Sequence, residues 1–115
     1  MAITKSKIDD YELIRRVLAG ETNLYGELQN RYKYQIKALI KKMIADRDDV
    51  EDLAQETFIK AYGALSRFQE GYTFSSWLYR IASNTCIDFL RKRRFPTISV
   101  SRPISTENDE VYIDI

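Results

Sequence analysis

Hydrophobic residues recur at intervals of three and four along most of this chain, a spacing that predicts amphipathic α-helices. Four segments show it, over about 9–19, 22–45, 48–66 and 74–95. The second segment is expected to form the longest helix. The fold class that this pattern predicts is all-α, a compact bundle of about four helices.

The ends of these helices are predicted from residues that cap or stop a helix. A side-chain oxygen at the N-cap accepts hydrogen bonds from the first free amides, whereas glycine and proline stop a helix. The predicted N-caps are Thr22, then Asp48 or Asp49, then Thr73 or Ser75, and the predicted stops are Gly20 and Pro96.

The two later helices each have one apolar face that is expected to form the core. On the third helix this face consists of Val50, Leu53, Ala54, Phe58, Ala61 and Leu65. On the fourth helix it consists of Phe74, Leu78, Ile81, Ala82, Thr85 and Phe89. These sets predict how both helices are rotated, and therefore which of their side chains stay outside the core.

With 115 residues, the chain is expected to form one helical domain over 1–95, followed by an irregular acidic linker or tail over 96–115. The single cysteine, Cys86, has no partner for a disulfide and no cysteine beside it for a metal site, which fits a reducing, cytoplasmic setting. No apolar run is long enough for a membrane span, and the N-terminus lacks the apolar region of a signal peptide.

Charged residues are segregated along the chain, although the formal net charge is only +1. Residues 31–42 include five basic residues and no acid, whereas residues 46–56 include six acids and one arginine. Basic residues cluster again at 91–94. Clusters of one sign create local fields that attract partners of the opposite sign, so separate surfaces are expected for separate partners.

Opposite its apolar stripe, the third helix has Asp52, Gln55, Glu56, Ile59 and Tyr62 at spacings of three and four. Apolar residues ringed by carboxylates are typical of a protein-docking patch with a charged rim. The alternative is that Ile59 and Tyr62 pack against another helix while the acids only favour the helix N-terminus. The spacing leaves both interpretations open.

A second arc of the fourth helix combines an aromatic ring, an amide and charged groups, in Trp77, Arg80, Asn84, Asp88 and Arg91. Cations bind phosphates, rings stack on unpaired bases and an amide can read a base edge, so this arc suits nucleic acid. Taken singly, Trp77 also fits a core or boundary position, and Asn84 a solvated one.

The turn before the fourth helix offers aromatic walls beside this arc, in Phe68 and Tyr72, followed by Thr73. A turn of this kind can hold one extruded base, since one or two base–aromatic contacts offset the few kcal/mol that extrusion costs. The alternative is a plain connector in which Phe68 and Tyr72 plug the core.

Two segments, DDVEDLAQETFIKAY and FSSWLYRIASNTCIDFLRKRRF, have the order and spacing of signatures in region two of bacterial RNA polymerase sigma factors, in the extracytoplasmic-function (ECF) group. The earlier AGETNLYGELQNRYKYQI resembles that family's preceding helices, and the resemblance covers about 10–95. It implies a sigma region-two-like fold. For function, it implies binding of core RNA polymerase and recognition and melting of the minus-ten promoter element in transcription initiation.

The resemblance also implies which residues bind which partner. The third helix would dock on the clamp coiled coil of the polymerase β′ subunit through Asp49, Asp52, Gln55, Glu56, Ile59 and Tyr62. The turn and the fourth helix would hold the single-stranded non-template minus-ten element of promoter DNA through Phe68, Tyr72, Thr73, Ser75, Trp77, Arg80, Asn84 and Arg91. An anti-sigma factor is a further candidate partner. Because the family usually has a region four after the linker, the chain is expected to be a fragment of a longer factor.

Two other classes stay open from the residues alone, a helical protein-interaction module and a duplex-DNA-binding regulator. An enzyme is not expected, because the chain has no histidine, no phosphate-binding glycine loop and no nucleophile with a recognisable base. Asp48, Asp49, Asp52 and Glu56 lack the spacing of a calcium loop. We therefore expect neither a metal nor a cofactor.

Overall fold

The computed structural model describes residues 8–69 and 71–94. Over these residues the chain forms α2 (Asp10–Leu18), the 3-10 turn η1 (Thr22–Leu24), α3 (Tyr25–Lys41), α4 (Arg47–Gly63), the 3-10 turn η2 (Leu65–Arg67) and α5 (Phe74–Arg94). The predicted all-α bundle of about four helices is confirmed. The linker predicted over 96–115 lies outside the described residues, as do Glu70 and Phe95.

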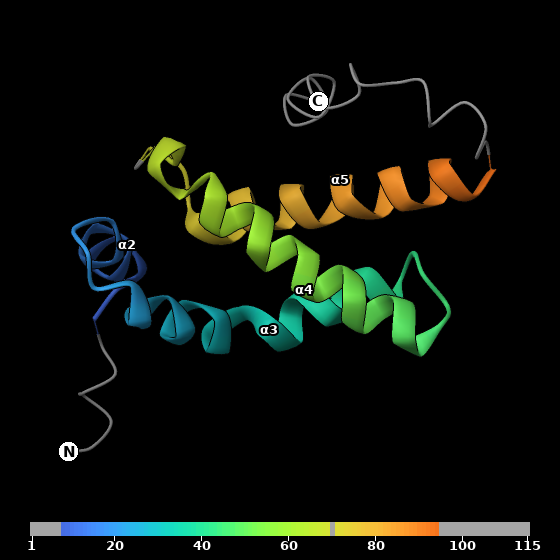
Figure 1. The fold of residues 1–115 in the computed structure, drawn as a ribbon, viewed down its shortest axis with the longest axis horizontal. Coiled ribbons are helices and arrows are strands. Elements are labelled where there is room, and N and C mark those ends of the chain that lie inside the picture. Colours follow the sequence, from blue (N-terminus) through green and yellow to red (C-terminus); the bar gives the residue numbers. More distant parts are fainter. Residues whose placement is uncertain (1–7, 70, 95–115) are drawn as a thin grey trace.

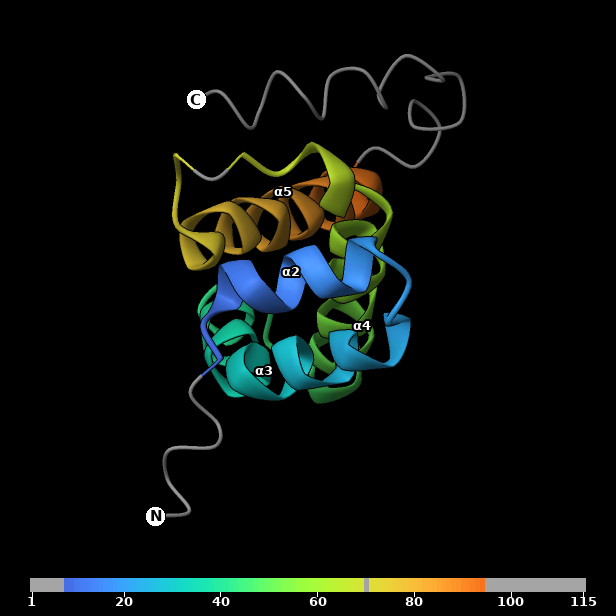
Figure 2. The same cartoon turned by 90° about the vertical axis from the view of Figure 1, so that its left-hand side faces the viewer.

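The four helices surround one core, with α4 in contact with both α3 and α5. In Figure 1, α4 runs diagonally across α3 and α5. Figure 2, turned by 90°, shows α2 lying across one end of this group. Because α4 packs on two neighbours at once, one of its sides is buried along its length and the other faces outward.

Helix α2 begins and ends where the sequence predicts. The Glu12 amide donates to Oδ1 of Asp9 over 2.9 Å, so Asp9 caps the helix. Gly20 has a φ of +120°, a backbone conformation that glycine adopts far more easily than other residues.

The predicted caps of α4 are wrong, since neither Asp48 nor Asp49 caps it. The cap is Asp46, whose extended backbone lets Oδ1 accept a 3.0 Å hydrogen bond from the Asp49 amide. Three aspartates within four positions all suit a helix start, and composition does not tell which of them has the extended backbone. The predicted Thr73 cap of α5 is correct, because its Oγ1 accepts from the Ser76 amide at 3.2 Å.

The predicted second helix is shorter than expected at both ends. Its first three residues form η1, where Thr22 makes no side-chain cap, and α3 ends at Lys41 rather than near Ala45. At that end the amides of Met43 and Ile44 both donate to the Ile40 carbonyl, which turns the chain and buries Ile44. The hydrophobic period continues through this turn, so the pattern does not reveal the break. With 21 residues against 17 in α3, α5 is the longest described helix.

The predicted core faces of α4 and α5 are confirmed. Every residue of the stripe predicted for the third helix is buried, although its last member, Leu65, lies in η2 because α4 ends at Gly63. Every residue of the α5 face is buried except Phe89, which packs against the core while half-buried. Two buried threonines satisfy their hydroxyls within their own helices, Thr57 to the Leu53 carbonyl and Thr85 to the Ile81 carbonyl. Cys86 is also buried, and burial raises the pKa of its thiol to about 11.

Shortening Leu78, which is fully buried on α5, should destabilise the domain by about 2–5 kcal/mol in a Leu78→Ala variant, through lost burial and a residual cavity. The matched control is Leu18→Ala, which changes a half-exposed leucine of α2 and should cost about 0.5 kcal/mol or less. Urea unfolding followed by circular dichroism measures both. Equal losses in the two variants would contradict the assigned core.

Candidate functional site

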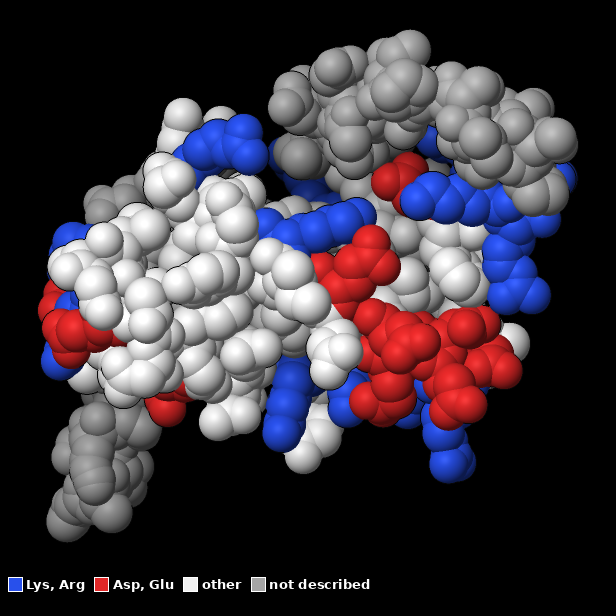
Figure 3. Space-filling view, viewed as in Figure 1, with Lys and Arg blue, Asp and Glu red and all other residues white. Residues whose placement is uncertain are grey.

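The outward side of α4 carries the predicted docking residues. Asp52, Gln55 and Glu56 are exposed, and so are Ile59 and Tyr62, which keep 67% and 44% of their surface accessible. The alternative that Ile59 packs against another helix is therefore wrong, because most of its side chain is exposed. Figure 3 shows acids gathered over the first turns of α4, with an uncharged surface beside them.

Ion pairs engage two of the predicted docking acids, Glu56 and Asp49. Glu56 pairs with Lys60 of its own helix at 3.3 Å, and Asp49 pairs with Arg93 at the end of α5 at 3.4 Å. Among the described residues, Asp52 has no ion pair. Exposed pairs of this kind contribute little to stability, so a partner's cations can replace them at small cost.

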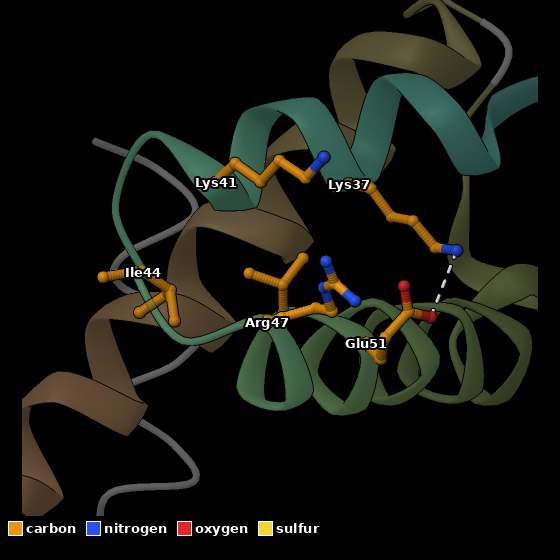
Figure 4. Close-up of a pocket in the computed structure, with 7 residues that line it drawn as sticks. Lys37, Lys41, Ile44, Arg47 and Glu51 are labelled. Atoms are coloured by element: carbon orange, nitrogen blue, oxygen red, sulfur yellow. Dashed lines mark ion pairs between the residues drawn. The ribbon is translucent and has the colours of Figure 1, made fainter.

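Two residues of the basic run, Lys37 and Lys41, face a hollow between α3 and α4. Lys37 and Lys41 of α3 and Arg47 of α4 line a pocket of about 570 Å³ beside Ile44 and Val50. Figure 4 shows Lys37 reaching from α3 to Glu51 on α4, and the Nζ to Oε1 distance is 3.1 Å. Glu51 supplies an anion to this hollow, and its ion pair with Lys37 joins α4 to α3.

The turn before α5 is fixed by an aromatic cluster. The Phe68 ring lies 6.0 Å from Tyr11, 5.8 Å from Phe74 and 5.3 Å from Trp77, measured between centroids. The Tyr11 hydroxyl donates to the Tyr72 carbonyl at 2.8 Å. Phe68 is therefore half-buried and acts as an anchor of the turn, as in the connector alternative.

Tyr72 differs from Phe68, because its ring stays outside the cluster. It keeps 61% of its surface accessible, and its amide donates to the Gln69 carbonyl at 3.1 Å, which closes the turn. The idea that Tyr72 plugs the core is wrong. An exposed ring whose backbone carbonyl and amide both form hydrogen bonds can stack on a base with a smaller loss of conformational freedom.

Thr73 and Ser75 are both engaged at the start of α5. The Thr73 hydroxyl caps the helix through the Ser76 amide and donates to the Ser76 hydroxyl at 2.9 Å. The Ser75 hydroxyl lies 3.5 Å from Thr73 Oγ1. These contacts place both residues beside the turn, where they shape its entry into the helix.

The predicted second arc of α5 lies outside the core. Trp77 is half-buried against Phe74, with ring centroids 5.7 Å apart, while Arg80 is exposed. Arg91 is exposed and pairs with Asp88 at 3.7 Å. The arc therefore offers one aromatic ring, that of Trp77, and two exposed cations, those of Arg80 and Arg91.

Asn84 is the unusual member of this arc. Its Nδ2 atom is buried and has no hydrogen-bond partner, and no other described side chain has a buried polar atom in that state. An unsatisfied buried amide costs about 1–3 kcal/mol, so such groups call for an explanation beyond folding. A ligand acceptor would remove this cost if the Asn84 side chain turned outward to meet it, because Nδ2 is shielded from solvent as it stands.

Two residues that position the site were not predicted. Tyr11 lies 61 positions from Tyr72 in sequence, and no local pattern connects them. Arg93 was grouped only as part of a basic helix end, yet it links α5 to Asp49 and lies over the Phe89 ring at 5.3 Å. Both contacts arise from tertiary packing alone.

The described residues contain no group of three or more cysteine, aspartate, glutamate or histidine side chains arranged to hold a metal ion. None of the described helices combines the length and the apolar character needed to cross a membrane.

Comparison with known proteins gives a consistent result. The family model described as Sigma-70 region 2 matches residues 28–95. The RNA polymerase sigma-H factor of Pseudomonas aeruginosa is 40% identical over 94 residues, which cover 80% of this chain and 49% of that protein. The ECF RNA polymerase sigma factor SigW of Bacillus subtilis is 38% identical over 102 residues, covering 89% and 54%. The chain thus spans about half the length of these relatives.

A solved structure has the same fold. It is described as an NMR structure of the complex formed by an engineered region 2 of sigmaE with GTAAAA. The match has a TM-score of 0.70 and 38% sequence identity, and it covers 77% of this chain and 95% of the other.

Proposed function

The chain belongs to the sigma-70 family of RNA polymerase sigma factors, ECF group, which it matches in region 2, and we propose from this that it binds core RNA polymerase and recognises and melts the minus-ten promoter element. The observation that carries the proposal is that the matched segment, 28–95, contains both the exposed acidic face of α4 and the arc of α5 that lies outside the core, in which Arg80 and Arg91 are exposed.

Polymerase binding is assigned to the outward side of α4. Asp52 and Glu56 supply negative charge, and Ile59 and Tyr62 supply exposed apolar surface one turn further along. This composition suits a basic helical partner, and the clamp coiled coil of the β′ subunit is the partner we assign. Asp49 belongs to the same surface and lies at its edge, next to Arg93.

Promoter binding is assigned to the turn and α5. Tyr72 and Trp77 provide rings for stacking, Arg80 and Arg91 provide cations for phosphates, and Asn84 provides an amide for a base edge. The single-stranded non-template strand fits these groups better than a duplex does, because rings stack only on unpaired bases. Phe68, Thr73 and Ser75 contribute by holding the shape of the turn.

Mechanistically, the module acts through binding and carries out no reaction of its own. Melting a base pair costs free energy, and capture of the released base by stacking and hydrogen bonds offsets that cost. Polymerase holds the module and the promoter together, so that the captured strand does not reanneal. A protein that works with core RNA polymerase acts in the cytoplasm, and no cofactor is needed for these steps.

The direct test is to mix the chain with core RNA polymerase that lacks any sigma factor. The complex is then challenged with single-stranded minus-ten and scrambled oligonucleotides at moderate salt, because phosphate contacts alone weaken steeply with salt. Polymerase binding with retention of only the minus-ten strand supports the proposal. Retention without sequence preference, or tight binding of intact duplex without polymerase, would favour the other classes.

Reversing charge on α4, in an Asp52→Lys/Glu56→Lys variant, should weaken binding to core polymerase by at least about tenfold, because like charges then face each other. The fold should persist, since both side chains are exposed. A control with the same change in net charge, Glu12→Lys/Glu27→Lys, alters α2 and α3 instead. Affinities measured by fluorescence titration that fall equally in both variants would argue against docking through α4.

An Asn84→Ala variant should lower retention of the minus-ten strand by about tenfold, as expected for loss of one base-reading amide. Its melting temperature should not fall through a lost hydrogen bond, because Nδ2 of Asn84 has no partner in the described fold. Polymerase affinity should be unchanged. Ser83→Ala, the preceding position, is the control. If Asn84→Ala lowers polymerase affinity as much as strand retention, α5 is not a dedicated DNA reader.

A further inference from the structure

A hollow of about 440 Å³ lies between the start of α3 and the second half of α4. Its walls are mostly apolar or aromatic and include Tyr25, Gly26, Phe58, Ile59 and Tyr62. Two of these residues, Ile59 and Tyr62, also belong to the outward side of α4. The hollow is therefore continuous with the surface assigned above to polymerase, and it extends that surface onto α3 and η1.

The wall of this hollow is held in place by Tyr25. Its ring is buried, and its hydroxyl donates to the Phe58 carbonyl at 2.7 Å. The phenol is protonated at neutral pH and can donate, and burial raises its pKa further above the ordinary value. The Tyr62 ring packs edge-on against Tyr25, with centroids 5.0 Å apart. The hollow is thus a formed feature of the fold.

Gly26 keeps the hollow open. It lies in the first turn of α3 with an ordinary helical backbone, and a Cβ placed there would meet nothing within 4 Å. The fold therefore does not require glycine at this position, and glycine in a helix costs about 1 kcal/mol relative to alanine. A larger side chain would occupy the space that the hollow offers to a partner.

Two acids of α4 lie near the hollow without lining it. Glu56 precedes Ile59 by three positions and pairs with Lys60, and Asp52 lies a further turn back on the exposed side of the helix. A partner that fills the hollow with an apolar side chain would thus bring its neighbouring side chains against carboxylates. Basic neighbours would be attracted and acidic ones repelled.

We propose that this hollow is the anchoring pocket of the docking surface, and that it receives one aliphatic side chain from a basic helix of core RNA polymerase. The inference rests on the proposed function and adds α3 and η1 to a surface otherwise assigned to α4 alone. An apolar anchor buried in a pocket and ringed by contacts that exclude water can carry a large share of the affinity of an interface. Gly26 then acts as a specificity-determining position.

The test fills the pocket without touching the acids. Gly26→Leu should keep the helical circular dichroism of the domain and weaken binding to core polymerase by about tenfold or more, the usual effect of losing an anchoring contact. Gly26→Ala adds one carbon and should bind within about threefold of the wild type. Ala38→Leu enlarges a small exposed residue of α3 that lies outside the lining of the hollow, and it should bind as the wild type does.

Removing one apolar wall provides a second variant. Ile59→Ser changes an exposed side chain, so it should fold normally, and it should weaken polymerase binding as Gly26→Leu does. Wild-type affinity in both variants would overturn the pocket while leaving docking through the acids intact. A wild-type chain that does not bind core polymerase at all would instead overturn the proposed function, and the pocket proposal with it.

Discussion

The contact of α4 with both α3 and α5 is the constraint on which the rest of the molecule depends. Small buried residues, Ala54 and Ala61 on α4 and Ala82 on α5, let the helices approach closely. Because one side of α4 is buried against two neighbours, the rotation of the helix is fixed. The exposed acids of α4 then face outward together with Ile59 and Tyr62 and form one surface. This arrangement leaves the large apolar side chain of Ile59 in contact with water.

The same packing brings α4, for which we propose polymerase binding, into direct contact with α5, for which we propose DNA binding. Lys60 of α4 reaches Thr85 of α5 at 3.3 Å, and Asp49 of α4 reaches Arg93 of α5 at 3.4 Å. A shared packed core joins the two proposed binding surfaces, so that docking of one would also position the other. This arrangement suits a module that must present a strand-binding surface to DNA only in the context of a larger complex.

The rotation of α4 and α5 about their axes could be predicted from the sequence. Burial of one face of a helix requires apolar residues at intervals of three and four, and that spacing is visible within each helix alone. The cap at Asp46, the end of α3 at Lys41 and the tie from Tyr11 to Tyr72 could not, because they depend on backbone direction and on contacts between distant segments. The outward set around Ile59 followed from the same period. The hollow beside Gly26 could not be predicted from this period, because residues of α3 and α4 form it together.

The most direct test of two separate surfaces is amide NMR of the free chain, titrated in turn with a minus-ten oligonucleotide and with a peptide of the polymerase clamp helices. The account predicts that the oligonucleotide shifts amides over 71–73 and along the arc of Trp77, Asn84 and Arg91. It predicts that the peptide shifts those over 52–62 and around Gly26. Overlapping shifts from both ligands, or an oligonucleotide that perturbs α4 and leaves α5 unchanged, would contradict it.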